Sequence, residues 1–178
     1  MIITISGKAE HGKTATANIL KEMLEKKGYK CLVMNFADRL KYMAKTYFGW
    51  NGKKDIEGRT LLQWLGTEYV RSRDPDFWVN SIISDINILD DLFDYFIIAD
   101  CRFSNEVNCF KELGEPYISI QVKRLKFENS LTEEQRSHPS ETELDNFEFD
   151  YIIESESGLN NLEIEVNKFF MKYCNMED

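Results

Sequence analysis

The feature that most constrains the fold is a glycine motif near the start of the chain, GKAEHGKT at residues 7–14. An apolar run typical of a buried strand, Ile2 to Ser6, precedes it, and apolar residues at helical spacing follow it from Lys13 to Lys27. A strand that turns through G-x-x-x-x-G-K-[ST] into a helix is the context in which this motif binds phosphate. The sequence therefore predicts a phosphate-binding loop at the first strand-to-helix turn.

The residue types in this loop fit the binding of a nucleoside triphosphate. Two glycines permit backbone conformations that point successive N–H groups inward, and the positive end of the following helix adds to the attraction for an anion. Lys13 is expected to bridge the β- and γ-phosphates, and the Thr14 hydroxyl is expected to ligate Mg²⁺. The side chains of Glu10 and His11 are expected to point away, while their amides bind. The residues predicted to hold the donor are Gly7, Lys8, Ala9, Glu10, His11, Gly12, Lys13, Thr14 and Ala15.

The rest of the chain alternates strand-like and helix-like segments. Apolar runs predict further strands at residues 29–36, 94–100, 117–122 and 151–153. Helical spacing predicts helices at residues 38–48 with Asp38 as N-cap, and at 60–73, 76–89, 103–113 and 159–170, with a polar loop at 51–58. Residues 126–144 are polar and have no clean period, which indicates a functional or mobile loop. Because such alternation implies right-handed crossovers, we expect an α/β fold of the P-loop NTPase type: three layers, with a five-stranded parallel sheet, helices on both faces and a lid segment.

Length and composition fit one soluble domain. The chain has 178 residues, of which 43% are hydrophobic and 30% charged, enough for one core but with little room for a second. No apolar run approaches the ~20 residues of a membrane span, and the first residues, MIITIS, are too short for a signal sequence. The cysteines lack CxxC spacing and are expected to be reduced structural thiols: Cys31, Cys101, Cys109 and Cys174. We therefore expect a cytoplasmic protein with no membrane partner.

The net charge of -9 is concentrated at one end of the chain. Residues 141–178 carry eleven acids and two bases, so residues 1–140 are neutral overall. Such a chain gains little from counterion release on DNA or RNA, so no polymeric nucleic acid partner is expected. A small anionic ligand needs only a few local cations and backbone N–H groups, and stays compatible with this balance.

Asp100 is the best candidate for a second Mg²⁺ ligand beside Thr14. It follows the apolar run FIIA at residues 96–99, so its side chain is expected at the carboxyl edge of the sheet, beside the phosphates. The alternative is that Asp100 is a strand-end acid that caps a helix.

Basic residues recur at or beyond the carboxyl ends of the predicted strands and around the polar loop. They are Arg39, Lys41, Arg71, Arg73, Arg102, Lys123, Arg124 and Arg136, and the alternative for each is an ordinary solvated surface charge. Two phosphorylated substrates meeting at this edge would need several arginines to neutralise them. A phosphate monoester has a second pKa near ~6, so it is already a nucleophilic dianion at neutral pH and requires no general base. The pattern indicates an enzyme that transfers a phosphoryl group to a phosphate acceptor.

Several longer segments resemble the phage-type deoxynucleoside monophosphate kinases. These segments are ISGKAEHGKT, NFADRLK, RTLLQWLGTEYVRSRDPDFWV, IIADCRFSNEV, VKR, SHPSETELD and FDYIIESESGLNNL, which span nearly the whole chain. The resemblance implies an adenylate-kinase-like P-loop fold, ATP and Mg²⁺ as the donor system, and a deoxynucleoside 5'-monophosphate (dNMP) as the acceptor that becomes a diphosphate. It implies one domain over residues 1–178, with an acceptor-binding region at about 38–90 and a lid at about 125–144.

The resemblance also implies roles for individual residues. The residues implied to bind the acceptor are Asp38, Arg39, Lys41, Gln63, Gly66, Glu68, Arg71, Trp78, Arg102 and Glu106. Among them, Trp78 would wall the base or else pack in the core, and Glu106 would orient Arg102, the phosphate clamp. Arg124 and Arg136 would bracket the lid and contact the transferring phosphoryl group or the ATP adenine and ribose. The implied catalytic group is therefore Lys13, Arg102, Arg124 and Arg136.

One recurring pattern of this family and three departures from it stand out. His138, Ser140 and Glu141 form an HxSE pattern, for which a lid-closing hydrogen-bond cluster is the plain alternative to a catalytic role. Arg39 and Ser104 stand where prolines are expected, and Cys101 where valine is common. These departures suggest a divergent member with a shifted base preference.

Two rival functions remain open at this stage. One is another small-molecule P-loop kinase, such as a dephospho-coenzyme A kinase, which would lack the LLQWLGTE and DCRFSNE pair. The other is a noncatalytic ATP-binding module, which would show gaps among the arginines or a damaged phosphate loop. The resemblance further suggests a phage-encoded protein in the host cytoplasm, and the sequence leaves a homodimer open.

Overall fold

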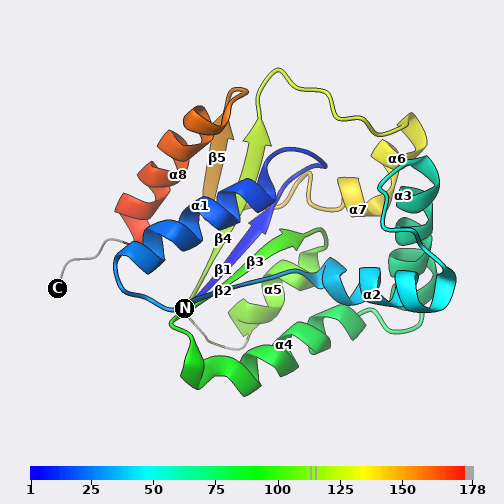
Figure 1. Cartoon of the computed structure of the whole chain (residues 1–178), viewed down its shortest axis with the longest axis horizontal. Helices are drawn as coiled ribbons and strands as arrows, with labels where there is room; N and C mark the ends of the chain where they lie inside the picture. Colours follow the sequence, from blue (N-terminus) through cyan, green and yellow to red (C-terminus); the bar gives the residue numbers. More distant parts are fainter. Residues whose placement is uncertain (113, 115, 175–178) are drawn as a thin grey trace.

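The computed structural model describes residues 1–112, 114 and 116–174. Its sheet has five strands in the order β2-β3-β1-β4-β5, and every neighbouring pair is parallel. The strands are β1 (Ile2–Ser6), β2 (Cys31–Met34), β3 (Tyr95–Cys101), β4 (Tyr117–Arg124) and β5 (Tyr151–Ser155). All five residues of β1 are buried, as expected for the central strand of a parallel sheet covered on both faces. The predicted three-layer fold is confirmed (Figure 1).

Helices cover both faces of the sheet. One face packs against α1 (Lys13–Lys26) and α8 (Leu159–Tyr173), whose buried leucines and phenylalanines meet the isoleucines of β1 and β4. The other face packs against α4 (Phe77–Leu89) and α5 (Ser104–Glu112), together with the start of α2 (Phe36–Phe48). The two cores thus lie on opposite sides of one sheet (Figure 1). The helix predicted over residues 103–113 ends at a position, 113, that lies outside the described residues.

Helix α2 begins earlier than the sequence suggests. Asp38 is not its N-cap, because Asn35 precedes the helix and Asp38 lies in its first turn. The amides of Phe36 and Ala37 donate to the carboxylate of Asp100 at 2.8 and 3.0 Å. A carboxylate that is distant in the sequence therefore satisfies the N-terminal amides and lets the helix start two residues sooner.

The helices between residues 56 and 92 also differ from the prediction. α3 (Ile56–Gln63) begins inside the expected polar loop, because the Asp55 carboxylate accepts a hydrogen bond from the Gly58 amide and caps the helix. The chain then continues into η1 (Trp64–Arg71), a π-helical segment, and not a regular α-helix. A short 3₁₀ turn, η2 (Asp90–Leu92), follows α4.

The polar segment at residues 126–144 is not wholly irregular. It contains α6 (Glu133–Ser137) and α7 (Pro139–Thr142), two helices too short to give a readable period. A capping box between Thr132 and Gln135 starts α6, and the His138 ring accepts from the Ser140 amide at the start of α7. Local capping therefore builds a defined lid over the carboxyl edge of the sheet (Figure 1).

Two further observations concern the chain as a whole. No helix within the described ranges has both the length and the apolar character needed to cross a bilayer. All four cysteines are buried, and no disulfide joins any of them within the described residues.

Candidate active site

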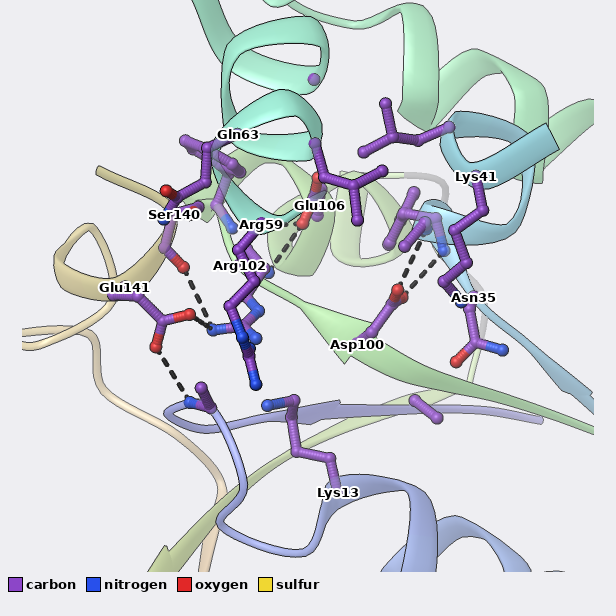
Figure 2. Close-up of a pocket in the computed structure, with 18 of the residues that line it drawn as sticks. Lys13, Asn35, Lys41, Arg59, Gln63, Asp100, Arg102, Glu106, Ser140 and Glu141 are labelled. Carbon is purple, nitrogen blue, oxygen red and sulfur yellow. Dashed lines mark hydrogen bonds and ion pairs between the residues drawn. The ribbon is translucent and has the colours of Figure 1, made fainter. Parts of the chain in front are cut away.

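A cavity of about 500 Å³ opens at the carboxyl edge of the sheet. Its walls come from the phosphate loop with the start of α1, the start of α2, α3 with η1, the end of β3, and the lid. Six basic and four acidic side chains line it: Lys13, Lys41, Lys54, Arg59, Arg71, Arg102, Glu10, Asp100, Glu106 and Glu141. Figure 2 shows many of them converging above the phosphate loop. The cavity has a formal excess of two positive charges and suits an anionic ligand.

The phosphate loop has the backbone that its glycines predict. Gly7 has a φ of 148°, and a Cβ placed on it would lie 2.4 Å from the carbonyl oxygen of Val122 in β4. The loop therefore packs against the neighbouring strand only because this position carries no side chain. Gly12, with a φ of 99°, leads directly into α1 and leaves the first amides of the helix pointing toward the cavity.

Lys13 is folded back over the loop. Its ammonium donates to the carbonyl oxygens of Gly7 and Lys8, both at 2.8 Å. Burial lowers the pKa of Lys13 well below its usual value, and the nearby Arg102 guanidinium acts in the same direction. An anion with two or more charges in the cavity would offset both effects.

The phosphate-loop residues Glu10 and His11 have defined side-chain partners. Glu10 adopts a left-handed φ of 65°, and its carboxylate accepts from Arg59 of α3 at 2.8 Å and from the amide and hydroxyl of Ser130 in the lid. These hydrogen bonds from Ser130, and then the charge of Arg59, lower the pKa of Glu10. The His11 ring instead accepts from the Arg124 amide at 3.2 Å. The Glu10 side chain therefore connects the phosphate loop to α3 and to the lid.

A carboxylate of the lid lies against the phosphate loop. Glu141 accepts a hydrogen bond from the Ala9 amide at 2.9 Å, and its second oxygen pairs with the guanidinium of Arg102 (Figure 2). Lys8 donates to the Glu141 carbonyl oxygen and to the Asp145 carboxylate. An anionic group thus already occupies one amide of the loop in this structure.

Arg71 and Glu106, from η1 and α5, form a buried ion pair in the wall of the cavity. The Arg71 guanidinium also donates to Asn105 and stacks 3.9 Å above the ring of Phe103, while its Nε has no hydrogen-bond partner among the described residues. Glu106 accepts a second set of hydrogen bonds, from the amides of Arg102 and Phe103. Burial raises the pKa of Glu106 to about 7, and the charge of Arg71 opposes that rise. Glu106 therefore orients Arg71 directly and meets Arg102 only at its backbone; the Arg102 guanidinium has Glu141 as its partner.

Trp78 forms an apolar wall of the cavity. It is 4% exposed, and its indole N–H donates to the carbonyl oxygen of Gly66 at 3.1 Å. A Cβ on Gly66 would lie 2.9 Å from the Leu40 side chain, so η1 packs closely on α2 at this glycine. Both readings of Trp78, core packing and a wall for the ligand, fit this placement.

Asp100 and Thr14 fit the ligand set of Mg²⁺. Both line the cavity, Thr14 from the first turn of α1 and Asp100 from β3. Asp100 caps α2, which was the alternative role predicted for it from the sequence. Each of its carboxylate oxygens accepts one hydrogen bond from α2 and keeps a lone pair that could bind a cation. Mg²⁺ takes one or two protein oxygens and fills its remaining positions with water and phosphate oxygens. No group of three or more His, Cys, Asp or Glu side chains that could hold a metal occurs among the described residues.

Some of the expected residues do not line this cavity. Five of them have partners elsewhere. On the helices, Asp38 contacts Asn35 and Lys41, Arg39 contacts Ser81 and Phe77, and Glu68 contacts His138. Arg124 contacts Ser157 and Phe127, and Arg136 donates to the carbonyl oxygens of Leu131 and Asn129. Gly7, Lys8, His11 and Arg124 line a second cavity of about 360 Å³ on the β4 side of the loop. The remaining predicted residues line the first cavity.

The HxSE pattern ties the lid to two other parts of the molecule. The His138 ring lies 2.8 Å from the Glu68 carboxylate of η1 and 2.8 Å from the Ser140 hydroxyl. Arg102 reaches the Ser140 carbonyl oxygen, beside Glu141. The pattern thus holds the lid between the acceptor helix and the phosphate loop.

The polar cavity residues that sequence reasoning did not identify include Asn35, Lys54 and Arg59. Arg59 stands four residues before Gln63, so helical spacing would have placed both on one face of α3. Asn35 and Lys54 lie outside the helices and have no periodic signal.

Comparison with known proteins identifies a family. A family model described as deoxynucleotide monophosphate kinase matches residues 32–166, about three quarters of the chain. The matched range begins after the phosphate loop and includes the acceptor side, β3 and the lid. No protein with a curated description matches the chain.

Solved structures with a similar backbone are distant in sequence. The structure titled "Crystal structure of APE1195" is 17% identical, with 99% of this chain and 96% of that chain covered and a TM-score of 0.52. The dephospho-CoA kinase from Campylobacter jejuni is 14% identical, with 96% of each chain covered and a TM-score of 0.49. The shikimate kinase from Acinetobacter baumannii in complex with shikimate is 13% identical, with 99% and 95% covered and a TM-score of 0.48. At these identities the likeness concerns the fold alone.

Proposed function

Because the chain belongs to the deoxynucleotide monophosphate kinase family, and so is a nucleotide-binding phosphotransferase, we propose that it moves the γ-phosphoryl group of ATP to a dNMP in the 500 Å³ cavity. The observation that carries the proposal is the continuity of this cavity. One wall is the phosphate loop with Lys13, and the opposite wall holds Arg71 and Trp78. A donor and an acceptor can therefore meet inside a single site.

The donor side uses the amides of the phosphate loop. The N–H groups of residues 9–14 and the start of α1 would bind the triphosphate, and Lys13 would leave its carbonyl partners for the β- and γ-phosphates. Thr14 and Asp100 would hold Mg²⁺, whose chemistry here is to neutralise the charge of the donor phosphates. Arg102 points into the same space from the end of β3.

The acceptor side uses the Arg71 guanidinium. Its pairing with Glu106 and its stacking on Phe103 fix its orientation in the cavity wall, where its positive charge would attract a monophosphate. Gln63 and Lys41 supply further polar contacts around the base and sugar, and Trp78 supplies an apolar wall. The finer roles of Asp38, Arg39 and Glu68 stay proposals, since each has a partner outside the cavity.

The chemistry requires alignment more than acid–base groups. A dianionic acceptor phosphate attacks without losing a proton, so the protein must hold two anions in line and spread their charge over its cations. The lid, which hydrogen-bonds to the phosphate loop through Glu141 and to the acceptor helix through His138, would keep water out during transfer. Arg124 and Arg136 would act at the two ends of this lid, Arg124 beside the second cavity on the donor side.

The test is an ATP-consumption assay with a panel of acceptors. The panel holds dAMP, dCMP, dGMP, dTMP, hydroxymethylated dCMP, the ribonucleotides and dephospho-coenzyme A. We expect turnover with at least one dNMP and none with dephospho-coenzyme A. Lys13→Met is the matched inactive control, with turnover lower by about 10²- to 10³-fold at an unchanged melting temperature. Turnover only with dephospho-coenzyme A, or ATP binding without any transfer, would favour one of the rival functions.

The proposal also covers the location of the protein, its oligomeric state and its domain organisation. The resemblance supports a phage-encoded enzyme in the host cytoplasm, and four buried cysteines that form no disulfide in the described part of the chain fit a reducing compartment. A homodimer is supported by exposed aromatic residues on α2 and η1: Tyr42, Tyr47, Phe48, Trp64 and Tyr69. Size-exclusion chromatography with light scattering measures the molar mass and so tests for the homodimer. We propose that residues 1–178 form one domain, with the acceptor region and lid as parts of it.

A further inference from the structure

The turn between α2 and α3 carries a lysine that no motif marks. Lys54 lines the cavity and is exposed to solvent at its rim. Among the described residues, its ammonium has no hydrogen-bond or ion-pair partner, while its carbonyl oxygen accepts from Arg59 at 3.0 Å. Lys54 is thus held by its backbone and free at its charged end.

The other cations of the cavity already have partners. Lys13 bonds to loop carbonyls, and the remaining four pair with carboxylates: Lys41 with Asp38, Arg59 with Glu10, Arg71 with Glu106 and Arg102 with Glu141. Lys54 therefore contributes a positive charge that has no ion-pair partner in the described part of the chain. It is one source of the positive excess of the cavity.

The surroundings of Lys54 favour an anion. Partial burial at the rim, followed by the charges of Lys41, Arg59 and Arg102, lowers the pKa of Lys54, and Asp100 acts in the opposite direction. Like charges gathered around one space destabilise one another until a negative group enters. Lys54 thus lines the same cavity as Arg102 and Asp100, close enough to feel the charge of both.

The backbone of this turn is tightly constructed. The Trp50 indole donates to the Lys53 carbonyl oxygen at 2.9 Å, and the Asp55 carboxylate caps the Gly58 amide at 2.9 Å. A Cβ on Gly58 would lie 2.1 Å from the Lys53 carbonyl oxygen, so this position requires glycine. These contacts fix the point from which the Lys54 side chain extends and reduce the loss of entropy when it binds.

We propose that Lys54 is a substrate-binding residue that contacts the 5'-phosphate of the acceptor. The inference rests on the proposed function and adds a contact to it. Lys54 comes from the acceptor-side turn with Lys41 as its neighbour, whereas the donor phosphates belong to the loop at residues 7–14. The acceptor phosphate is the anion that would enter between them.

The experiment compares three variants with the wild type on the best dNMP of the panel. Lys54→Met removes the charge and keeps the stem, Lys54→Arg restores a charge, and Lys53→Met is the control one residue away, outside the cavity lining. Initial rates give the acceptor KM and kcat, and calorimetry with a nonhydrolysable ATP analogue gives the donor Kd. We expect Lys54→Met to raise the acceptor KM about 10- to 100-fold, with a donor Kd within about twofold of the wild type. Lys54→Arg should recover most of this loss, and Lys53→Met should behave as the wild type.

The outcomes separate the inference from the proposed function. An unchanged acceptor KM in Lys54→Met, in an otherwise active wild type, overturns the inference and leaves the function standing. A weakened donor Kd with an unchanged acceptor KM also overturns it, because it moves Lys54 to the donor. If the wild type phosphorylates no dNMP, the proposed function fails and the inference fails with it. Equal melting temperatures of all variants, in thermal unfolding, ensure that the kinetics concern binding.

Discussion

At the scale of single residues, charge in this cavity is arranged in pairs that a substrate can redistribute. Arg71 with Glu106 and Arg102 with Glu141 are ion pairs between largely buried side chains. Burying such pairs contributes little net stability, because desolvation offsets their attraction. Their value is orientation, since a guanidinium held on one side by a carboxylate presents its other N–H groups to a ligand in a fixed direction.

Glu106 gives a prediction about pH. Its folded-state pKa of about 7 lies above the ordinary 4.5, so between these pH values the folded protein binds more protons than the unfolded chain. Its contribution to stability is therefore fully present below about pH 4.5 and is lost as the pH rises through about 7. We expect the free energy of unfolding of the wild type, relative to Glu106→Gln, to fall by on the order of 2 kcal/mol between about pH 5 and about pH 8.

Urea unfolding followed by tryptophan fluorescence at the two pH values measures this difference. Glu163→Gln, on the exposed side of α8, is the control and should show no such trend. A difference that grows with pH would mean that the ion pair with Arg71 outweighs burial and that Glu106 stays charged.

At the scale of elements, the sequence predicts what is set locally. All five strands and the phosphate loop follow from apolar runs and one motif, because neighbours in the chain decide them. The start of α2 depends on Asp100, 64 positions from Phe36, and no pattern near residue 36 carries that information. The lid helices α6 and α7 are shorter than two helical turns, so their hydrophobic period cannot be read.

In the candidate site, too, local sequence predicts some features and distant residues determine others. Lys13, Asp100 and Arg102 could be placed in it because motif and strand ends fix their positions. The partner of each charge could not be predicted, since Glu141 meets Ala9 across 132 positions of sequence. The family resemblance therefore names residues more reliably than it names their contacts.

The contact of α7 with the phosphate loop gives a prediction for the lid. Glu141 occupies the Ala9 amide and the Arg102 guanidinium, two groups that we propose bind the triphosphate. Glu141→Gln removes the competing charge, so we expect the Kd of a nonhydrolysable ATP analogue to fall about 3- to 10-fold, measured by calorimetry. Glu143→Gln, two residues further on and paired with Ser104 outside the cavity lining, should leave the Kd unchanged. A weaker Kd in Glu141→Gln would instead show that Glu141 holds the loop in its binding shape.

At the scale of the whole molecule, the two cores share one sheet, and we therefore expect residues 38–90, the proposed acceptor region, to unfold together with the rest of the chain. Trp78 of the acceptor region packs in the same cluster as Phe96 and Ile98 of β3, whose Ile97 faces the opposite core. The lid adds a hydrogen bond from the Ser130 hydroxyl to the Glu10 carboxylate, and its Gln135 carbonyl oxygen accepts one from the Gln63 side chain. Loosening residues 38–90 would therefore expose the sheet itself.

The tryptophans make this cooperativity measurable. Trp50, Trp64 and Trp78 all lie in the acceptor region, so fluorescence reports that region, whereas far-ultraviolet circular dichroism reports every helix and strand. We expect both signals to change in one urea transition with the same midpoint, as for a two-state domain. A ligand that bridges the donor and acceptor sites, at about 100 times its Kd, should raise the free energy of unfolding by about 2.7 kcal/mol in both signals. Both midpoints should therefore move together to a higher urea concentration. A fluorescence midpoint at a lower urea concentration than the dichroism midpoint would mean that the acceptor region unfolds alone. In that case the ligand would stabilise this region more than the rest and bring the two midpoints closer together.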